Sequence, residues 1–91
     1  MIYCRSERFR KSFKTLPRHI QEKAVKAFSL FKQDPGHPSL GVKKMEGKEG
    51  IWEGRVDVFY RFTFHYEYDL SGERVCLFRN IGPHDILDTA P

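Results

Sequence analysis

The sequence has 91 residues, of which 40% are hydrophobic and 31% charged, a composition typical of one domain with a single hydrophobic core. No apolar run is long enough for a signal peptide or a membrane span, so we expect a soluble cytoplasmic protein with no membrane partner. The net charge of +4 is uneven: residues 1–45 carry eleven basic and three acidic side chains, residues 46–91 five and nine, which suits a polyanionic partner or, equally, a solvated lysine-rich helix face.

The first half of the sequence predicts a short strand and two helices. Residues 2–4 favour a strand, and Ser6 is a suitable N-cap for the helix after it. Three apolar residues fall on one face of that helix: Phe9, Phe13 and Leu16. Pro17 separates it from a second helix, whose apolar residues repeat with helical period between positions 20 and 31. We expect the two helices to form a hairpin.

The second half predicts strands. After Gly41 the pattern alternates with a period of two, most strongly over Tyr60–Tyr68, where aromatic residues occupy every second position. The opposite face of that strand carries Arg61, Thr63, His65 and Glu67. A turn over residues 69–73 leads to a last strand, Arg74 to Ile81, with apolar residues on both faces. The predicted class is α+β: a short N-terminal strand and a two-helix hairpin packed on an antiparallel sheet of about four strands, in one domain spanning residues 1–91.

The two cysteines favour structural roles. Cys4 and Cys76 are far apart and each lies within an apolar run, as expected for buried reduced thiols. Phosphate-loop motifs, dinucleotide-binding glycines and paired Cys or His at metal-ligand spacing are absent from the sequence. We therefore expect no cofactor and no metal site.

Three arginines lie in predicted strands, where aliphatic residues are more usual: Arg55, Arg61 and Arg79. If their strands are neighbours, the guanidinium groups can converge on one face, a geometry that binds phosphate. Taken singly, each is better explained as a solvated or salt-bridged surface arginine, and only the three together with His84 indicate a site. A Gly-Pro turn follows Arg79 and fixes His84, so we predict a functional site at this end of the last strand.

Trp52 allows two interpretations. It could stack on a base of single-stranded RNA, as aromatic side chains do in RNA recognition. It could instead anchor the sheet to the helices. The sequence favours the anchoring role and leaves base stacking as the alternative.

The order of elements and several motifs resemble the RelE/ParE superfamily of type II toxin–antitoxin toxins. The motifs are residues 9–17 of the helical hairpin, Trp-Glu-Gly-Arg-Val at 52–56, Tyr-Arg at 60–61 and Arg-x-x-Gly-x-His at 79–84. The resemblance spans nearly the whole chain and implies a RelE-like fold. It also implies a toxin that, in the RelE, HigB and YafQ-like branches, cuts messenger RNA in the ribosomal decoding site until an antitoxin captures it.

The resemblance implies roles for individual residues. Metal-free cleavage makes the ribose 2′-hydroxyl attack the adjacent phosphate, which requires a base, an acid and cations. By position, Arg61 and Arg79 would clamp the scissile phosphate and Arg55 would assist them. His84 would be the general acid. RelE has lysines in the strand where this sequence has Trp52 and Gly54, which leaves Lys48 as a remote substitute.

The general base is unassigned by the resemblance. YafQ-like toxins carry a further histidine and an aspartate before the strand that corresponds to Tyr60–Tyr68, and this sequence lacks that arrangement. Asp57 and His65 are the candidates. Asp57 could instead have a purely structural role at the end of a strand, and His65 could be an ordinary residue on the polar face of the sheet.

Two other functions fit the resemblance. One is a ParE-like toxin that binds DNA gyrase and needs no nuclease site, and the other is a catalytically silent relative that only binds its antitoxin. His84 separates them from the nuclease, because a gyrase binder needs no titratable acid beside Arg79. A cognate antitoxin is the expected partner in each case, and mRNA on the ribosome is a further partner only for the nuclease.

Overall fold

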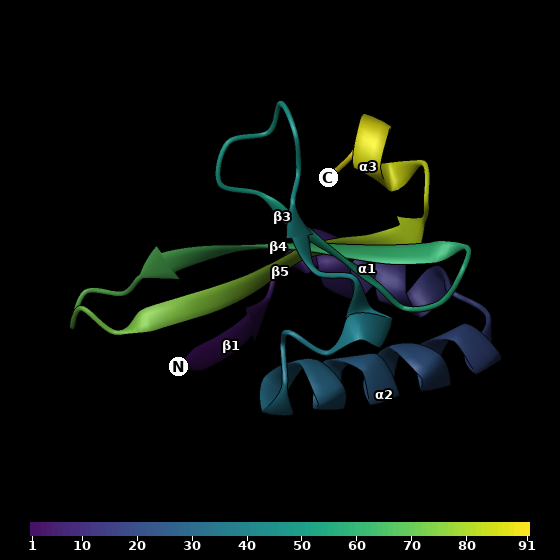
Figure 1. Ribbon diagram of the computed structural model, residues 1–91, viewed down its shortest axis with the longest axis horizontal. Coiled ribbons are helices and arrows are strands. Elements are labelled where there is room, and N and C mark those ends of the chain that lie inside the picture. Colours follow the sequence, from purple (N-terminus) through teal and green to yellow (C-terminus); the bar gives the residue numbers. More distant parts are fainter.

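The computed structural model describes residues 1–91 as a mixed sheet with helices on both of its faces (Figure 1). In chain order the elements are β1 (Ile2–Arg5), α1 (Glu7–Thr15), α2 (Arg18–Gln33), the 3-10 helix η1 (Pro38–Leu40), β2 (Lys43–Lys44), β3 (Trp52–Arg55), β4 (Tyr60–Tyr68), β5 (Arg74–Pro83) and α3 (Ile86–Thr89). None of the helices has the length and apolar character needed to cross a membrane.

The five strands lie in the order β1-β5-β4-β3-β2. Strand β1 pairs parallel with β5, and every other pairing is antiparallel. The predicted α+β class is therefore confirmed, and the sheet differs from the prediction in being five-stranded and mixed. The difference arises because the N-terminal strand joins the sheet beside the last strand of the chain. In Figure 1, α2 runs along one face of the sheet and α3 lies over the other.

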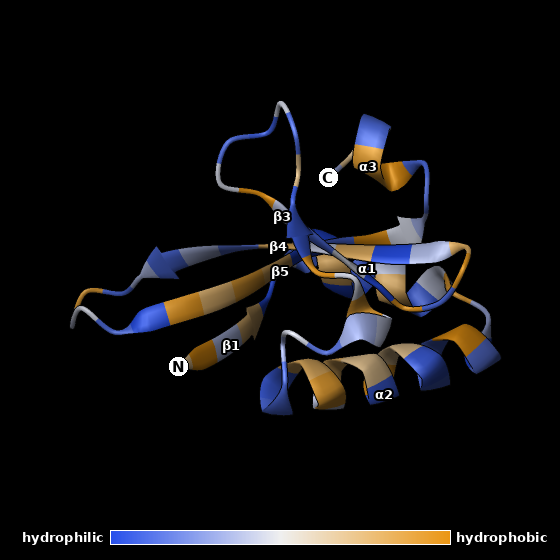
Figure 2. Ribbon diagram, viewed as in Figure 1, coloured by the Kyte–Doolittle hydropathy of each residue, from blue (hydrophilic) through white to orange (hydrophobic).

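Phenylalanine side chains form the core between the sheet and the helical hairpin. Phe62 and Phe64, two positions of the aromatic alternation in β4, are fully buried and contact Phe31 of α2 edge to face, with ring centroids 5.8 and 4.9 Å apart. Phe9 of α1 packs 5.7 Å from Phe78 of β5. Burying each such side chain contributes about 1.5–3 kcal/mol. Figure 2 shows that α2 is amphipathic, with apolar and hydrophilic segments alternating along the helix.

The cysteine prediction is correct for one residue and wrong for the other. Cys76 of β5 is fully buried, and burial raises the pKa of its thiol to about 11. Cys4 is exposed. It lies on edge strand β1, where Tyr3 turns inward to contact Phe31 and Phe78, so the alternation of side chains directs Cys4 away from the helices.

Candidate functional site

One face of the sheet is polar. We call it the polar face: Glu53 and Arg55 of β3, Arg61, Thr63 and His65 of β4, and Arg79 of β5. Side chains alternate along a strand, so directing Phe62 and Phe64 into the core places their neighbours on this face. Sequence analysis therefore correctly grouped the polar residues of β4, and the structure adds residues from the strands on either side.

Arg55 and Arg61 face each other directly across the β3–β4 pair. Both line a pocket of about 360 Å³, together with Ser39, Asp57 and Val58. Neither guanidinium forms an ion pair, and the nearby carboxylate of Asp57 lies 3.4 Å from the ammonium of Lys23. Two unpaired guanidinium groups on one pocket make it suited to a phosphate or another oxyanion.

The turn between β3 and β4 is held by the carboxylate of Asp57. Its Oδ1 accepts hydrogen bonds from the backbone N–H groups of Phe59 and Tyr60, at 2.9 and 2.8 Å. Burial on its own would raise the pKa of Asp57, but these two hydrogen bonds and the ammonium of Lys23 outweigh it, and the pKa lies below its ordinary value. The carboxylate is thus ionised at neutral pH and committed to the turn, which makes it a weak general base.

The same turn holds both Arg61 and His84. The Nη1 of Arg61 donates to the carbonyls of Asp57, Val58 and Tyr60, at 2.7, 3.1 and 3.1 Å. The backbone N–H of His84 donates to the carbonyl of Phe59, at 2.8 Å. Residues more than twenty positions apart in the sequence are therefore fixed to one rigid backbone segment.

His84 is exposed and lines a pocket of about 330 Å³. The other charged residues around this pocket are Lys43, Lys44, Glu46, Glu53 and Asp88. Sequence analysis missed Lys43 and Glu53, which are direct partners across the β2–β3 pair. Because β2 has only two residues, its sequence has no periodic pattern that predicts a strand. The adjacent lysines at 43 and 44 do mark a local concentration of positive charge.

Arg79 lies at a β-bulge. Thr63 pairs with Asn80 and Phe64 with Phe78, which leaves Arg79 as the extra residue of β5. Bulges redirect side chains, and here the guanidinium donates from Nη1 to Nδ1 of His65 at 2.8 Å and from Nε to the carbonyl of Pro91 at 3.1 Å.

The contact with Arg79 determines which tautomer of the neutral His65 ring fits. A guanidinium can only donate, so Nδ1 of His65 accepts and the ring proton of the neutral imidazole is on Nε2, which faces Glu67 at 3.2 Å. Arg79 and His84 share neither a pocket nor a hydrogen bond. The three arginines are thus divided: Arg55 and Arg61 converge, and Arg79 lies apart with His65.

Trp52 lies on the core side of the sheet. Its ring stacks on Phe64, with centroids 6.1 Å apart and planes 15° from parallel, and meets Tyr66 edge to face. The ammonium of Lys44 lies 5.4 Å from the centroid of the Trp52 ring. These contacts favour the anchoring role over base stacking. Lys48 is exposed in the β2–β3 loop, outside the pockets of Arg61 and His84.

Nowhere in the structure do three His, Cys, Asp or Glu side chains gather in a group that could hold a metal ion. The side chains that line the two pockets supply guanidinium and ammonium groups, an imidazole and carboxylates. These are the components of phosphate binding and of proton transfer.

Three solved structures that match this fold are toxins or toxin complexes. The YoeB/ParE toxin from Agrobacterium tumefaciens matches with a TM-score of 0.70 and 16% identity over 92% of this chain and 99% of that one. The RelB–RelE antitoxin–toxin complex from Methanococcus jannaschii matches with a TM-score of 0.69 and 19% identity over 100% of both chains. YafQ from E. coli gives 0.73 and 13%, over 93% and 94%.

No family model and no curated protein matches the sequence. The structural likeness covers nearly the whole chain in each comparison, and the fold is therefore the RelE-like fold that the sequence predicted. At these identities the likeness establishes the fold, and fold alone does not define an activity.

Proposed function

We propose that the chain is the toxin of a type II toxin–antitoxin system and cleaves mRNA on the ribosome without a metal. The observation that carries this proposal is the β3–β4 turn. It holds Arg61, whose guanidinium lines a pocket with that of Arg55 and forms no ion pair, and its Phe59 carbonyl also holds the backbone of His84, which lines the pocket that includes Glu53. The RelE-like fold supports it. An anion site next to an exposed imidazole is what cleavage of a phosphodiester requires.

In this mechanism the scissile phosphate binds between Arg55 and Arg61. The 2′-hydroxyl of the preceding ribose attacks the phosphorus, and the fixed guanidinium groups stabilise the additional charge of the phosphorane. Arg79 lies apart from this pair, beside His65, and would contact a neighbouring part of the RNA backbone through Nη2, which makes no hydrogen bond within the protein. His84 donates a proton to the departing 5′ oxygen.

We propose Glu53 as the base that accepts the proton of the 2′-hydroxyl. It lines the same pocket as His84, so an acid and a base border one cavity. The two candidates from the sequence are less suitable. Asp57 already accepts two backbone hydrogen bonds, and the Nδ1 lone pair of His65 is occupied by Arg79. They remain alternatives to be tested beside Glu53.

A cognate antitoxin is the proposed partner, as in the RelB–RelE complex from M. jannaschii. A groove of about 340 Å³ between β1 and α2 offers it an apolar floor that includes Tyr3, Phe28 and Phe78, with Arg5 and Lys32 also lining it. The outer edge of β1 is free to pair with another strand. An amphipathic acidic segment fits this groove, and a cytoplasmic location follows from a ribosomal target.

Cleavage of message on programmed ribosomes tests the proposal. We expect cuts in the decoding site from the wild-type protein, and a loss of about 10²-fold or more for His84→Ala and for Arg61→Ala, the range typical of a lost general acid or charge stabiliser. His19→Ala is the matched control, because His19 is an exposed histidine on α2. Absence of cleavage, together with inhibition of gyrase supercoiling, would instead support the ParE-like alternative.

A further inference from the structure

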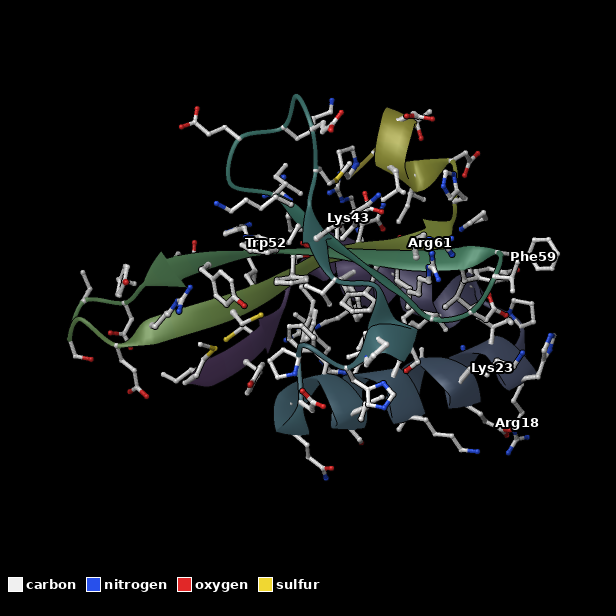
Figure 3. The ribbon with its side chains drawn as sticks, viewed as in Figure 1. Arg18, Lys23, Lys43, Trp52, Phe59 and Arg61 are labelled. Atoms are coloured by element: carbon white, nitrogen blue, oxygen red, sulfur yellow. The ribbon has the colours of Figure 1, made fainter.

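Val58 and Phe59 form an exposed apolar tip on the β3–β4 turn. Their side chains are 77% and 72% exposed, so neither contributes to the core. Figure 3 shows the Phe59 ring at the end of the sheet, directed outward. Trp52, the aromatic that the sequence offered for base stacking, is instead packed on Phe64. Phe59 is thus the freely accessible aromatic next to the candidate site.

The backbone of Phe59 is held at both of its polar groups. Its N–H donates to Oδ1 of Asp57 at 2.9 Å, and its carbonyl accepts from the N–H of His84 at 2.8 Å. The carbonyl of Val58 accepts from Arg61 at 3.1 Å. A ring presented on a fixed backbone loses little conformational entropy when it binds a partner. An exposed phenylalanine on a mobile loop would lack this advantage.

Charge distinguishes this tip from the other exposed apolar tip of the sheet. Near Phe59, the residues Lys23, Arg55 and Arg61 provide three cations, with Asp57 as the one carboxylate. The β4–β5 hairpin also exposes apolar side chains, Tyr68 and Leu70. Its charged residues are Glu67, Asp69, Glu73 and Arg74. A partner with phosphates and flat apolar rings fits the first tip and is repelled by the second.

We infer that Phe59 is a stacking platform for one unpaired nucleobase of the RNA substrate. The inference rests on the proposed function and adds a base-binding subsite to it. The pocket of Arg55 and Arg61 also includes Val58, so a base on Phe59 and a neighbouring phosphate in this pocket bind at adjacent points of one surface. Stacking accepts any base, so Phe59 strengthens and orients the bound RNA without selecting its sequence.

Abasic messages separate stacking from every other role of the side chain. Programmed ribosomes receive either an intact message or one in which a single nucleotide around the cut site is abasic, with each position replaced in turn. We expect Phe59→Ala to cleave the intact message about 10-fold more slowly than wild type, the effect of losing one stacked base. On the message that is abasic at the stacked position, both proteins should cleave at the same reduced rate.

Two further variants complete the test. Phe59→Trp should retain the wild-type rate, because indole also stacks, and Leu70→Ala, which removes an apolar side chain from the acidic hairpin, should have no effect. Both side chains that these three variants replace are exposed, so melting temperatures should be unchanged.

Three results would overturn the inference, and they are distinguishable from failure of the proposed function. If wild type cleaves and Phe59→Ala is equally active, no stacking occurs at Phe59. If Phe59→Ala slows cleavage of intact and all abasic messages equally, the ring contacts the ribosome and not a base of the message. If wild type does not cleave at all, the nuclease function fails and the base-binding subsite fails with it.

Discussion

At the scale of single residues, Gly54 occupies a position in β3 where a side chain would clash with the core. The ring of Phe62 lies across it, and a Cβ at position 54 would approach Cε1 of Phe62 to 2.6 Å. Real Cβ atoms do not come this close, so the ring would have to move in a core that is already filled. We expect Gly54→Ala to lower the free energy of unfolding by about 1–3 kcal/mol, measured by urea denaturation.

Gly36→Ala is the matched control for this substitution. A Cβ at position 36 would meet its nearest neighbour, Oδ1 of Asp34, at 3.8 Å, an ordinary contact. We expect unchanged or slightly increased stability, because alanine reduces the entropy of the unfolded chain. Equal losses in both variants would contradict the packing explanation for Gly54.

The two cysteines should differ in reactivity towards a thiol reagent. At pH 8, exposed Cys4 should react in the native protein and buried Cys76 only after denaturation, because the pKa of Cys76 is raised to about 11. Quantifying thiols with and without denaturant measures this. Reaction of two thiols at equal rates in the native protein would show that β5 is more open than the structure indicates.

The same thiol gives stability a defined dependence on alkaline pH. In the unfolded chain Cys76 loses its proton near its ordinary pKa of 9.0, whereas in the folded protein it retains the proton up to about 11. The unfolded state therefore binds fewer protons between these values, and stability falls as pH rises from 9 to 11. Cys76→Ala should remove this component of the decline, measured by urea denaturation across that range.

At the scale of elements, Ser6 joins the start of α1 to the bulge in β5. Its hydroxyl accepts from the N–H of Phe9 at 3.0 Å and donates to the carbonyl of Arg79 at 2.8 Å. Ser6→Ala removes both bonds, and we expect a loss of about 1–2 kcal/mol in the free energy of unfolding. Ser6→Thr keeps a hydroxyl and should lose less. Cleavage by Ser6→Ala should also decrease if the position of Arg79 depends on this bond.

The groove between β1 and α2 gives a second prediction at this scale. Val25 of α2 lines it and is 56% exposed, so Val25→Asp should fold normally. If an acidic amphipathic antitoxin segment binds there, the new charge should weaken its affinity by about 10-fold or more, measured by calorimetry, and leave cleavage unchanged. Leu70→Asp is the control. Unchanged affinity of Val25→Asp would exclude this groove.

Elements with long periodic patterns were predictable from sequence, and those defined by distant pairing were not. The helical hairpin and β4 repeat their apolar residues over many positions, which is why both were predicted correctly. The two-residue β2, the four-residue α3 and the parallel pairing of β1 depend on contacts with remote strands.

The same limit applies to the candidate site. The sequence proposed that Arg55, Arg61 and Arg79 converge if their strands are neighbours, and Arg55 and Arg61 do lie at matching positions on neighbouring strands. The bulge at Arg79 could not be foreseen, because it depends on how β5 aligns with β4, and it directs this side chain to His65 instead of His84. The sequence could not assign Glu53 to the pocket of His84, because residues of β2 and α3 form much of that pocket.

At the scale of the whole molecule, opposite ends of the β4 strand differ in charge. The β3–β4 turn lies near Lys23 of α2 and the arginine pair, whereas the β4–β5 hairpin carries mostly carboxylates. Lys23 and Lys26, two of the basic residues in the first half of the sequence, therefore lie on a surface beside the candidate site, where they line a pocket with Arg55. Such polarity orients an approaching polyanion before any specific contact forms.

Two lysines on the same helix test whether this polarity is used. Lys26 lines a pocket with Arg55, whereas Lys32 lies over the ring of Tyr3, 5.2 Å from its centroid, beside β1. Lys26→Gln and Lys32→Gln each lower the net charge by one, so a purely global effect of charge on binding would be equal. If RNA runs past Lys26, its loss should reduce the slope of log affinity against log salt by about 0.7, the value per phosphate contact for a single strand, while Lys32→Gln leaves the slope unchanged. Equal slopes for both variants, measured by salt titration of ribosome or oligonucleotide binding, would mean that the basic surface of α2 serves solubility and not the path of the RNA.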